Sequence, residues 1–283
     1  MSDNTAETYK LLGYKIEIDY DQDRDSPRDW GRESTMICWS GRNTLGDEPE
    51  FGNGSAGSPS LDAEEYLMAM AENFDPGIEE WRDREDNRLY TKHGYTSTYK
   101  EALAELRDRV RARIERALDA HYLMLPLYVY EHGGITMNTG GYSCPWDSGQ
   151  AGYIYITKKA ALKEFGSHRG ANGKSKILTR KLREEYLGYL KGEVEEYAQF
   201  LEGDVYCTSV TRKGKHIDSC CGYYGLDYAK SEAEAAVNFD HKERTETAYH
   251  ERGYNVASGQ WLRPSKTKCE KLFHAMQEAL THE

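Results

Sequence analysis

The chain has 283 residues, of which 38% are hydrophobic and 30% are charged. Its 22 tyrosines add apolar area that a mean hydropathy of −0.84 hides, so we expect a folded chain rather than disorder throughout. The formal net charge of −11 argues against a general nucleic-acid binder, and no apolar run reaches the roughly 18 residues that span a bilayer.

These quantities set expectations for the whole chain. We expect a single compact domain over residues 1–283, although the length also suits two closely packed domains. The N-terminus has neither a basic start nor an apolar stretch, which predicts a cytoplasmic protein. Six scattered cysteines predict free thiols without a disulfide, and no pattern indicates a cofactor.

The first part of the chain alternates short strands and a polar loop. Alternating polar and apolar residues predict strands near Tyr14 and Met36, which could pair as a long-looped hairpin. Glycine, serine and proline over residues 41–60 predict a flexible surface loop.

Helices follow this loop. Ser60 is a suitable cap for a helix that enters at Leu61. A longer amphipathic helix is predicted from Thr98 to about Tyr122, where Thr98 and Glu101 have the spacing of a capping box.

The second part begins with two aromatic strands near Leu127 and Tyr153, which we expect to be central in a sheet. A long amphipathic helix over residues 178–201 ends at Gly203. Further elements are strands near Val205 and His216 about a Lys213-Gly214 turn, a polar helix over 227–249 and a short helix over 272–280. The sequence therefore predicts an α+β fold, with a mainly antiparallel sheet packed against two or more long amphipathic helices.

Charge is distributed unevenly. Ten acids and two arginines lie between residues 62 and 86, and this segment gives the predicted acidic binding surface of Glu79, Glu80, Asp83, Glu85 and Asp86. Nine lysines and arginines and one acid lie between residues 158 and 183. The basic segment could bind an anion through Lys174, Lys176, Arg180 and Lys181, or neutralise the acidic helices within the protein.

The glycine-rich segment over 131–149 concentrates chemically capable side chains between two predicted core strands, where loops often carry function. Cys144 and His132 would be its nucleophile and base. The alternative is an ordered structural loop anchored by Trp146. The candidate residues of this loop are His132, Thr136, Ser143, Cys144, Trp146 and Asp147.

Two patterns suggest metal ligands without completing a site. Asp19, Asp21, Asp23 and Asp25 resemble half of a calcium loop, but the glycine and the glutamate of that loop are missing, so a solvated acidic turn is the alternative. His216, Asp218 and Cys220 alternate and would bind zinc only with a fourth ligand from elsewhere. We predict no metal site from either pattern.

Several segments resemble a recurrent family of tailed-bacteriophage proteins, usually described as hypothetical. They are 134–136, 143–150, 203–206 and 218–225, with weaker similarity at 26–30, 36–38 and 45–47. The most specific piece is Pro-Trp-Asp-Ser-Gly at 145–149. The resemblance implies a phage origin and provides no activity and no catalytic residues.

A phage origin and an acidic charge together predict a non-enzymatic accessory protein. It would inhibit or modulate a host nucleic-acid enzyme or defence complex in the host cytoplasm, and its partner would be a host or defence protein with a basic surface. Nucleic-acid binding is left open and no membrane is involved. The alternative is a metal-assisted hydrolase or transferase acting on nucleotides or nucleic acid, with the 131–149 loop joined to Asp218-Ser219-Cys220 and phosphate held by 174–183.

Overall fold

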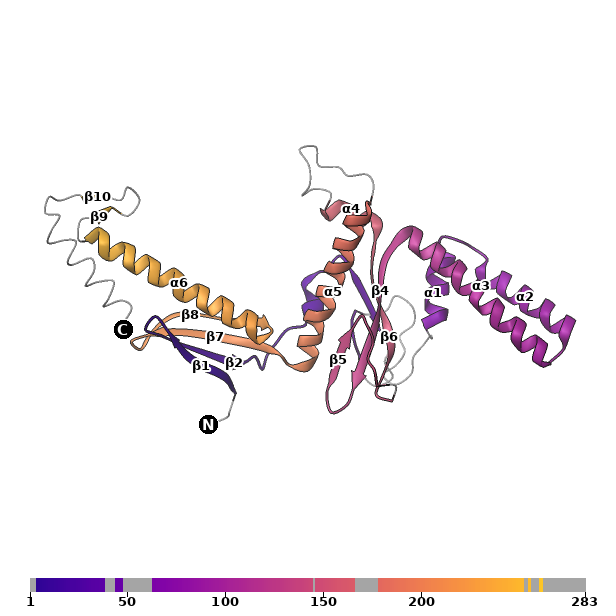
Figure 1. Ribbon diagram of the computed structural model, residues 1–283, viewed down its shortest axis with the longest axis horizontal. Helices are drawn as coiled ribbons and strands as arrows, with labels where there is room; N and C mark the ends of the chain where they lie inside the picture. Colours follow the sequence, from indigo (N-terminus) through magenta and orange to yellow (C-terminus); the bar gives the residue numbers. More distant parts are fainter. Residues whose placement is uncertain are drawn as a thin grey trace. The chain divides into compact units, whose positions relative to one another are not determined.

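The computed structural model describes residues 4–38, 44–47, 63–144, 146–165, 178–251, 254–255 and 260–261. Contacts between residues divide the chain into two compact units rather than one: Met1–Ser26 with Gln199–Glu283, and Pro27–Ala198. Both units combine antiparallel strands with helices, so the predicted α+β class is confirmed (Figure 1). The predicted helix over 272–280 lies outside the described residues.

The first unit is a four-stranded antiparallel sheet in the order β1-β2-β7-β8, followed by a long helix. Its elements are β1 (Thr5–Leu11), β2 (Tyr14–Tyr20), β7 (Val205–Arg212), β8 (Lys215–Tyr224), α6 (Leu226–Glu251) and the short pair β9 (Tyr254–Asn255) and β10 (Gln260–Trp261). Tyr14, Ile16 and Ile18 point to one face of β2 and are fully buried. They pack with Ala229 and Ala233 of α6, whose small side chains let the helix lie close to the sheet.

The β7–β8 turn forms as the sequence predicts. Lys213 and Gly214 both have positive φ angles, 48° and 75°, which suits a tight two-residue hairpin turn. The helix predicted over 227–249 is α6. The strand predicted near His216 is β8, which precedes α6 in the chain and is an edge strand of the sheet.

The second unit has a four-stranded antiparallel sheet in the order β3-β6-β4-β5, with helices on both sides. Its elements are the 3-10 turn η1 (Pro27–Trp30), β3 (Thr35–Cys38), α1 (Ala63–Glu72), α2 (Ile78–His93), α3 (Ser97–His121), β4 (Tyr122–Glu131), β5 (Ile135–Asn138), β6 (Ser148–Thr157), α4 (Lys158–Phe165) and α5 (Arg180–Glu202). The expected central strands near Leu127 and Tyr153 are β4 and β6, and both have a neighbour on each side.

Two sides of this sheet pack against different helices. Figure 1 shows α5 on one side and α1 to α3 on the other. Ile37, Met124 and Tyr155 belong to the side that contacts α1 to α3, where they meet the buried stripe of α3. That stripe includes Leu106, Val110, Ile114 and Leu118, as the apolar spacing of three or four residues in this segment predicts.

Other details of the fold differ from the prediction. The strands near Tyr14 and Met36 do not pair with each other, because β2 lies in one sheet and β3 in the other. The cap of α3 is Thr96, whose hydroxyl accepts from the Tyr99 amide, so the predicted cap at Thr98 is wrong. The sequence predicts one strand on each side of the glycine-rich segment. The structure has a further short strand, β5, within that segment.

Residues 44–47 are the described part of the loop predicted over 41–60, and they pack against β3. The Asp47 amide donates to the Met36 carbonyl at 2.7 Å, and Leu45 is buried. A Cβ at Gly46 would press on the same carbonyl, so only glycine fits there. The remainder of the predicted loop lies outside the described residues.

None of the described helices is both long enough and apolar enough to span a bilayer.

Candidate functional site

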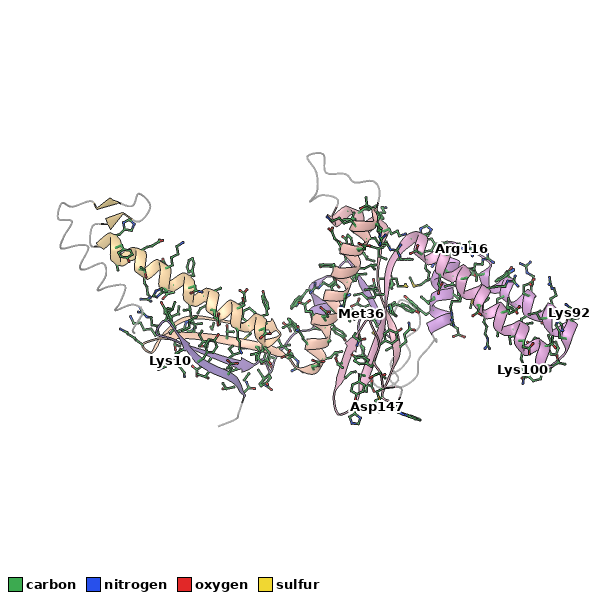
Figure 2. The ribbon with its side chains drawn as sticks, in the orientation of Figure 1. Lys10, Met36, Lys92, Lys100, Arg116 and Asp147 are labelled. Atoms are coloured by element: carbon green, nitrogen blue, oxygen red, sulfur yellow. A yellow bond between two sulfur atoms is a disulfide. The ribbon has the colours of Figure 1, made fainter. Side chains whose placement is uncertain are left out.

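The glycine-rich segment is a hairpin end of the second unit, where β4, β5 and β6 meet. Asp147 is its central residue and lies at the margin of the sheet in Figure 2. Its carboxylate contacts the His132 Nδ1 at 3.2 Å and accepts from the Cys144 thiol at 3.6 Å, while its carbonyl accepts from the Glu131 amide. The Ser148 hydroxyl donates to the Cys144 carbonyl.

This arrangement differs from a nucleophile and base. A thiol activated by imidazole needs a direct contact between the two groups, whereas Cys144 and His132 both contact the same Asp147 oxygen. The contacts close a loop around one carboxylate, which is the structural alternative that the sequence left open.

Trp146 is not the anchor of this loop. Its side chain is 91% exposed, so the prediction of an anchoring tryptophan is wrong. The turn is instead held by Asn138, whose Oδ1 accepts from the amides of Gly140 and Gly141 at 3.0 and 2.8 Å. The Asn-Thr-Gly-Gly sequence was the available signal, because asparagine commonly bonds to the backbone of its own turn. Of the other candidates, Thr136 is half-buried in β5 and Ser143 is exposed.

The predicted acidic surface lies on α2, and the structure divides it in two. Glu79, Glu80 and Asp83 are exposed to solvent. Glu85 and Asp86 are half-buried, and they are used within the hairpin of α2 and α3. The Glu85 carboxylate lies 3.9 Å from Arg109 of α3, and Asp86 accepts from the Tyr99 hydroxyl at 2.7 Å.

The charge of α2 is balanced mainly by its own hairpin. Helix α2 carries five acids and four Lys/Arg, and α3 carries five acids and six Lys/Arg. Arg82 contacts both Glu79 and Asp83, at 3.2 and 2.8 Å. Arg113 of α3 binds Asp75 through two 2.6 Å hydrogen bonds, which lower the pKa of that carboxyl. The labelled Lys92 and Lys100 lie near the end of the hairpin in Figure 2, and Arg116 lies nearer the sheet.

The basic segment is only partly described. Lys174 and Lys176 lie outside the described residues, Lys181 is exposed, and Arg180 pairs with Glu184 on its own helix at 2.8 Å. Arg183 binds Asp119 of α3 at 2.7 Å and lowers the pKa of that carboxyl. Arg183 of the basic segment therefore pairs with an acid of the protein itself. That acid, Asp119, belongs to α3 and not to the acidic 62–86 segment.

A buried charge network that the sequence analysis missed lies between η1, β3 and α5. The side chains of Arg28 and Glu193 are only 4% and 3% exposed. Arg28 binds both oxygens of Asp47 at 3.0 and 2.8 Å and Glu193 at 2.6 Å, and the Ser34 hydroxyl also donates to Glu193. Desolvation, followed by the nearby Asp47 carboxylate, raises the pKa of the Cys38 thiol to about 12.

One signal could have revealed this network. Glu193 lies on the apolar stripe of α5, between Leu190 and Tyr197, where an acid is buried only with a partner. The network also brings together the segments 26–30, 36–38 and 45–47, which carry the weaker part of the phage resemblance.

The first unit contains a disulfide, which corrects the expectation of free thiols. Cys207 of β7 and Cys221 of β8 are bonded across the two strands. Cys38, Cys144 and Cys220 are the free cysteines of the described residues.

The alternation of His216, Asp218 and Cys220 does not place them on one face. A register shift between Val210 and Thr211 makes His216 pair with Thr211, and Asp218 pair with Val210. Paired residues point to the same side of a sheet. His216 therefore points to one face, and Asp218 and Cys220 point to the other. The three side chains therefore do not share one strand face, and the His216 Nε2 bonds to the Ser219 hydroxyl at 3.1 Å.

The four aspartates of the N-terminal turn do not gather around one point. Asp21 alone, with Cys207 and Cys221, belongs to a group of potential metal ligands within the described residues. Its Oδ1 accepts from the Asp23 amide and its Oδ2 from the Gly222 amide. Asp19, Asp23 and Asp25 do not join Asp21 in a group of potential ligands among the described residues.

A cleft of about 680 Å³ opens beside the sheet of the second unit, and no sequence pattern indicates it. Its walls include Tyr122 and Tyr153, and its charged groups are two arginines and two acids: Arg111, Arg183, Glu115 and Asp119. The candidate residues named from the sequence are absent from the described lining. Since Arg183 is paired with Asp119, this cleft offers little net charge to a ligand.

Comparisons with protein-family models, with curated proteins and with solved structures find no match for this chain. The resemblance to tailed-phage proteins therefore stays a prediction.

Proposed function

We propose that this chain is a non-enzymatic accessory protein of a tailed bacteriophage. In this proposal it inhibits or modulates a host nucleic-acid enzyme or defence complex by presenting carboxylates to a basic surface of that partner. The observation that carries the proposal is the exposure of Glu79, Glu80 and Asp83 together on α2. Carboxylates on one exposed helix face attract a basic partner surface and orient its approach.

The proposal uses a smaller surface than the sequence suggested. Glu85 and Asp86 bond within the hairpin, so their loss would disturb the hairpin before it disturbed a partner. The geometry at Cys144, His132 and Asp147 supports a non-catalytic role for the 131–149 loop, because the thiol lacks a direct contact with the imidazole among the described interactions.

A pull-down from host lysate with and without nuclease, followed by binding measurements on the retained protein, tests the proposal. Charge reversal of Glu79, Glu80 and Asp83 should weaken binding by at least about tenfold, and wild-type binding should weaken steeply with salt. The matched control reverses Glu101, Glu105 and Asp108, three exposed acids of α3, and should bind as wild type does.

A second control replaces His132 or Cys144 with alanine and should leave the affinity unchanged. The opposite pattern, in which the loop variants lose binding and the α2 variant retains it, would reject the acidic surface. Retention of nucleic acid alone would reject the proposed class of partner.

A further inference from the structure

The open face of the first unit's sheet carries two sulfur atoms and one carboxylate at the same place. Asp21 follows β2, Cys207 lies in β7 and Cys221 lies in β8, so three chain segments meet there. Their ligand atoms all lie within 4.8 Å of one another. Asp21 is nearly buried at 9% exposure, whereas Cys221 is exposed, so the group is reachable from solvent.

The backbone fixes the carboxylate at this place. The Gly222 amide donates to Asp21 Oδ2 at 3.2 Å, and the Asp23 amide donates to Oδ1 at 3.1 Å. Gly222 has a φ of +83° beside a register shift of β7 and β8, a conformation that favours glycine. Each carboxylate oxygen has a second lone pair, which can bind a cation without breaking these bonds.

We propose that Asp21, Cys207 and Cys221 form a redox-controlled site for zinc, or for a soft divalent cation of similar preference. The disulfide is the closed state of this site. The open state has two thiolates and one carboxylate, and a water molecule completes a tetrahedron.

The chemistry balances with a thiol as the reductant. One disulfide and two thiol molecules give two cysteine thiols and one disulfide of the reductant. Binding of Zn²⁺ to the two cysteines then releases two protons, and Asp21 contributes a carboxylate oxygen as the third protein ligand. In a tetrahedral zinc site the ligand atoms are separated by roughly 3.5–3.8 Å. The two bonded sulfurs must therefore move apart on reduction, while the Asp21 oxygen already lies within 4.8 Å of both.

The ligand types select the cation. Thiolates disfavour calcium and magnesium, which prefer oxygen, and they favour zinc. Cys220 precedes Cys221 in sequence but pairs with Thr208 and points to the other face of the sheet, so it is not a ligand. This neighbour provides a matched control.

The test measures zinc binding to the full chain, reduced with a phosphine and freed of reductant, by competition with a chromophoric chelator. The reduced wild type should bind one more zinc ion per chain than the oxidised wild type. Cys207→Ser and Cys221→Ser should each lose that ion, and Asp21→Asn should weaken binding by at least about tenfold. Cys220→Ser should bind as the wild type does.

Cobalt provides a second readout, because Co²⁺ bound by thiolates shows a charge-transfer band that tracks the ligands. This band should appear in the reduced wild type and in Cys220→Ser, and be lost in Cys207→Ser. Circular dichroism confirms that each variant is folded. Equal zinc binding by reduced wild type and Cys207→Ser, or no additional zinc after reduction, would overturn the proposal.

Discussion

Arg28 illustrates how single residues determine the structure of the second unit. Its guanidinium is almost fully buried and binds Asp47, Glu193 and the Ser34 carbonyl. A buried charge is tolerated only when its partners replace the lost water, and removal of one partner leaves the others uncompensated. Arg28 therefore connects η1, the 44–47 segment and α5 through one side chain.

At this scale we expect Arg28→Met to lower the free energy of unfolding by about 3–5 kcal/mol, because it leaves buried carboxylates without their cation. Urea denaturation measures the change. Lys191→Met is the control, since Lys191 also pairs with an acid of α5, Glu195, but at an exposed position. It should change the free energy by less than about 1 kcal/mol. Equal losses in the two variants would contradict the structural role of the network.

At the scale of elements, small local features decide how helices begin and which face a strand presents. Helix α3 begins at Ser97, so Thr96 is its N-cap. The spacing of Thr98 and Glu101 suggests Thr98 instead. In β8, the register shift moves His216 away from Asp218. Neither feature is visible in the hydrophobic pattern, because the pattern sets the buried face and leaves the ends and bulges undetermined.

The cap gives a direct comparison of two threonines. Thr96→Ala should cost about 0.5–2 kcal/mol of unfolding free energy, since it removes the acceptor for the Tyr99 amide. Thr98→Ala should change the free energy of unfolding by less than about 0.5 kcal/mol, because Thr98 is exposed and lies inside the helix. Urea denaturation of both variants distinguishes them. A larger loss at Thr98 would show that the helix begins where the sequence spacing indicates.

At the scale of the whole molecule, each unit has its own buried core. The first core is built on Tyr14, Ile16 and Ile18 with α6, and the second on α1 to α3 with Ile37 of β3. The disulfide belongs to the first unit alone, where it links residues 14 apart in sequence. A cross-link of this length limits the unfolded chain of one unit only.

Reduction of the disulfide should therefore destabilise the first unit selectively, by roughly 3 kcal/mol according to the loop length. Hydrogen exchange with mass spectrometry measures this, because the amides of β2, β7 and α6 should lose protection while those of α3 and β4 keep it. Cys207→Ser should reproduce the effect without reductant, and Cys220→Ser should not. An equal loss in α3 and β4 would show that the units unfold together.

The sequence by itself determined most of the longer elements and their buried faces, but it did not indicate β1, β5 or α4. The stripes of α3 and α5, the strands β2, β4, β6 and β7, and the Lys213-Gly214 turn all follow from spacing and turn chemistry. These features depend on neighbours within a few residues, which the sequence lists in order. Which acids lie on α2 also follows from the sequence, whereas the structure shows that Arg82 contacts two of them.

Only the tertiary structure decided which strands pair, which charges are buried and which cysteines meet. Strands β2 and β3 are close in sequence yet belong to different sheets, and Cys207 meets Cys221 because a hairpin folds them together. Asp47 and Glu193 converge on Arg28 from positions far apart in the chain. Such contacts form only when long stretches of chain close around a shared core. The free energy that stabilises this closure comes from packing over the whole unit and is not encoded at any one position.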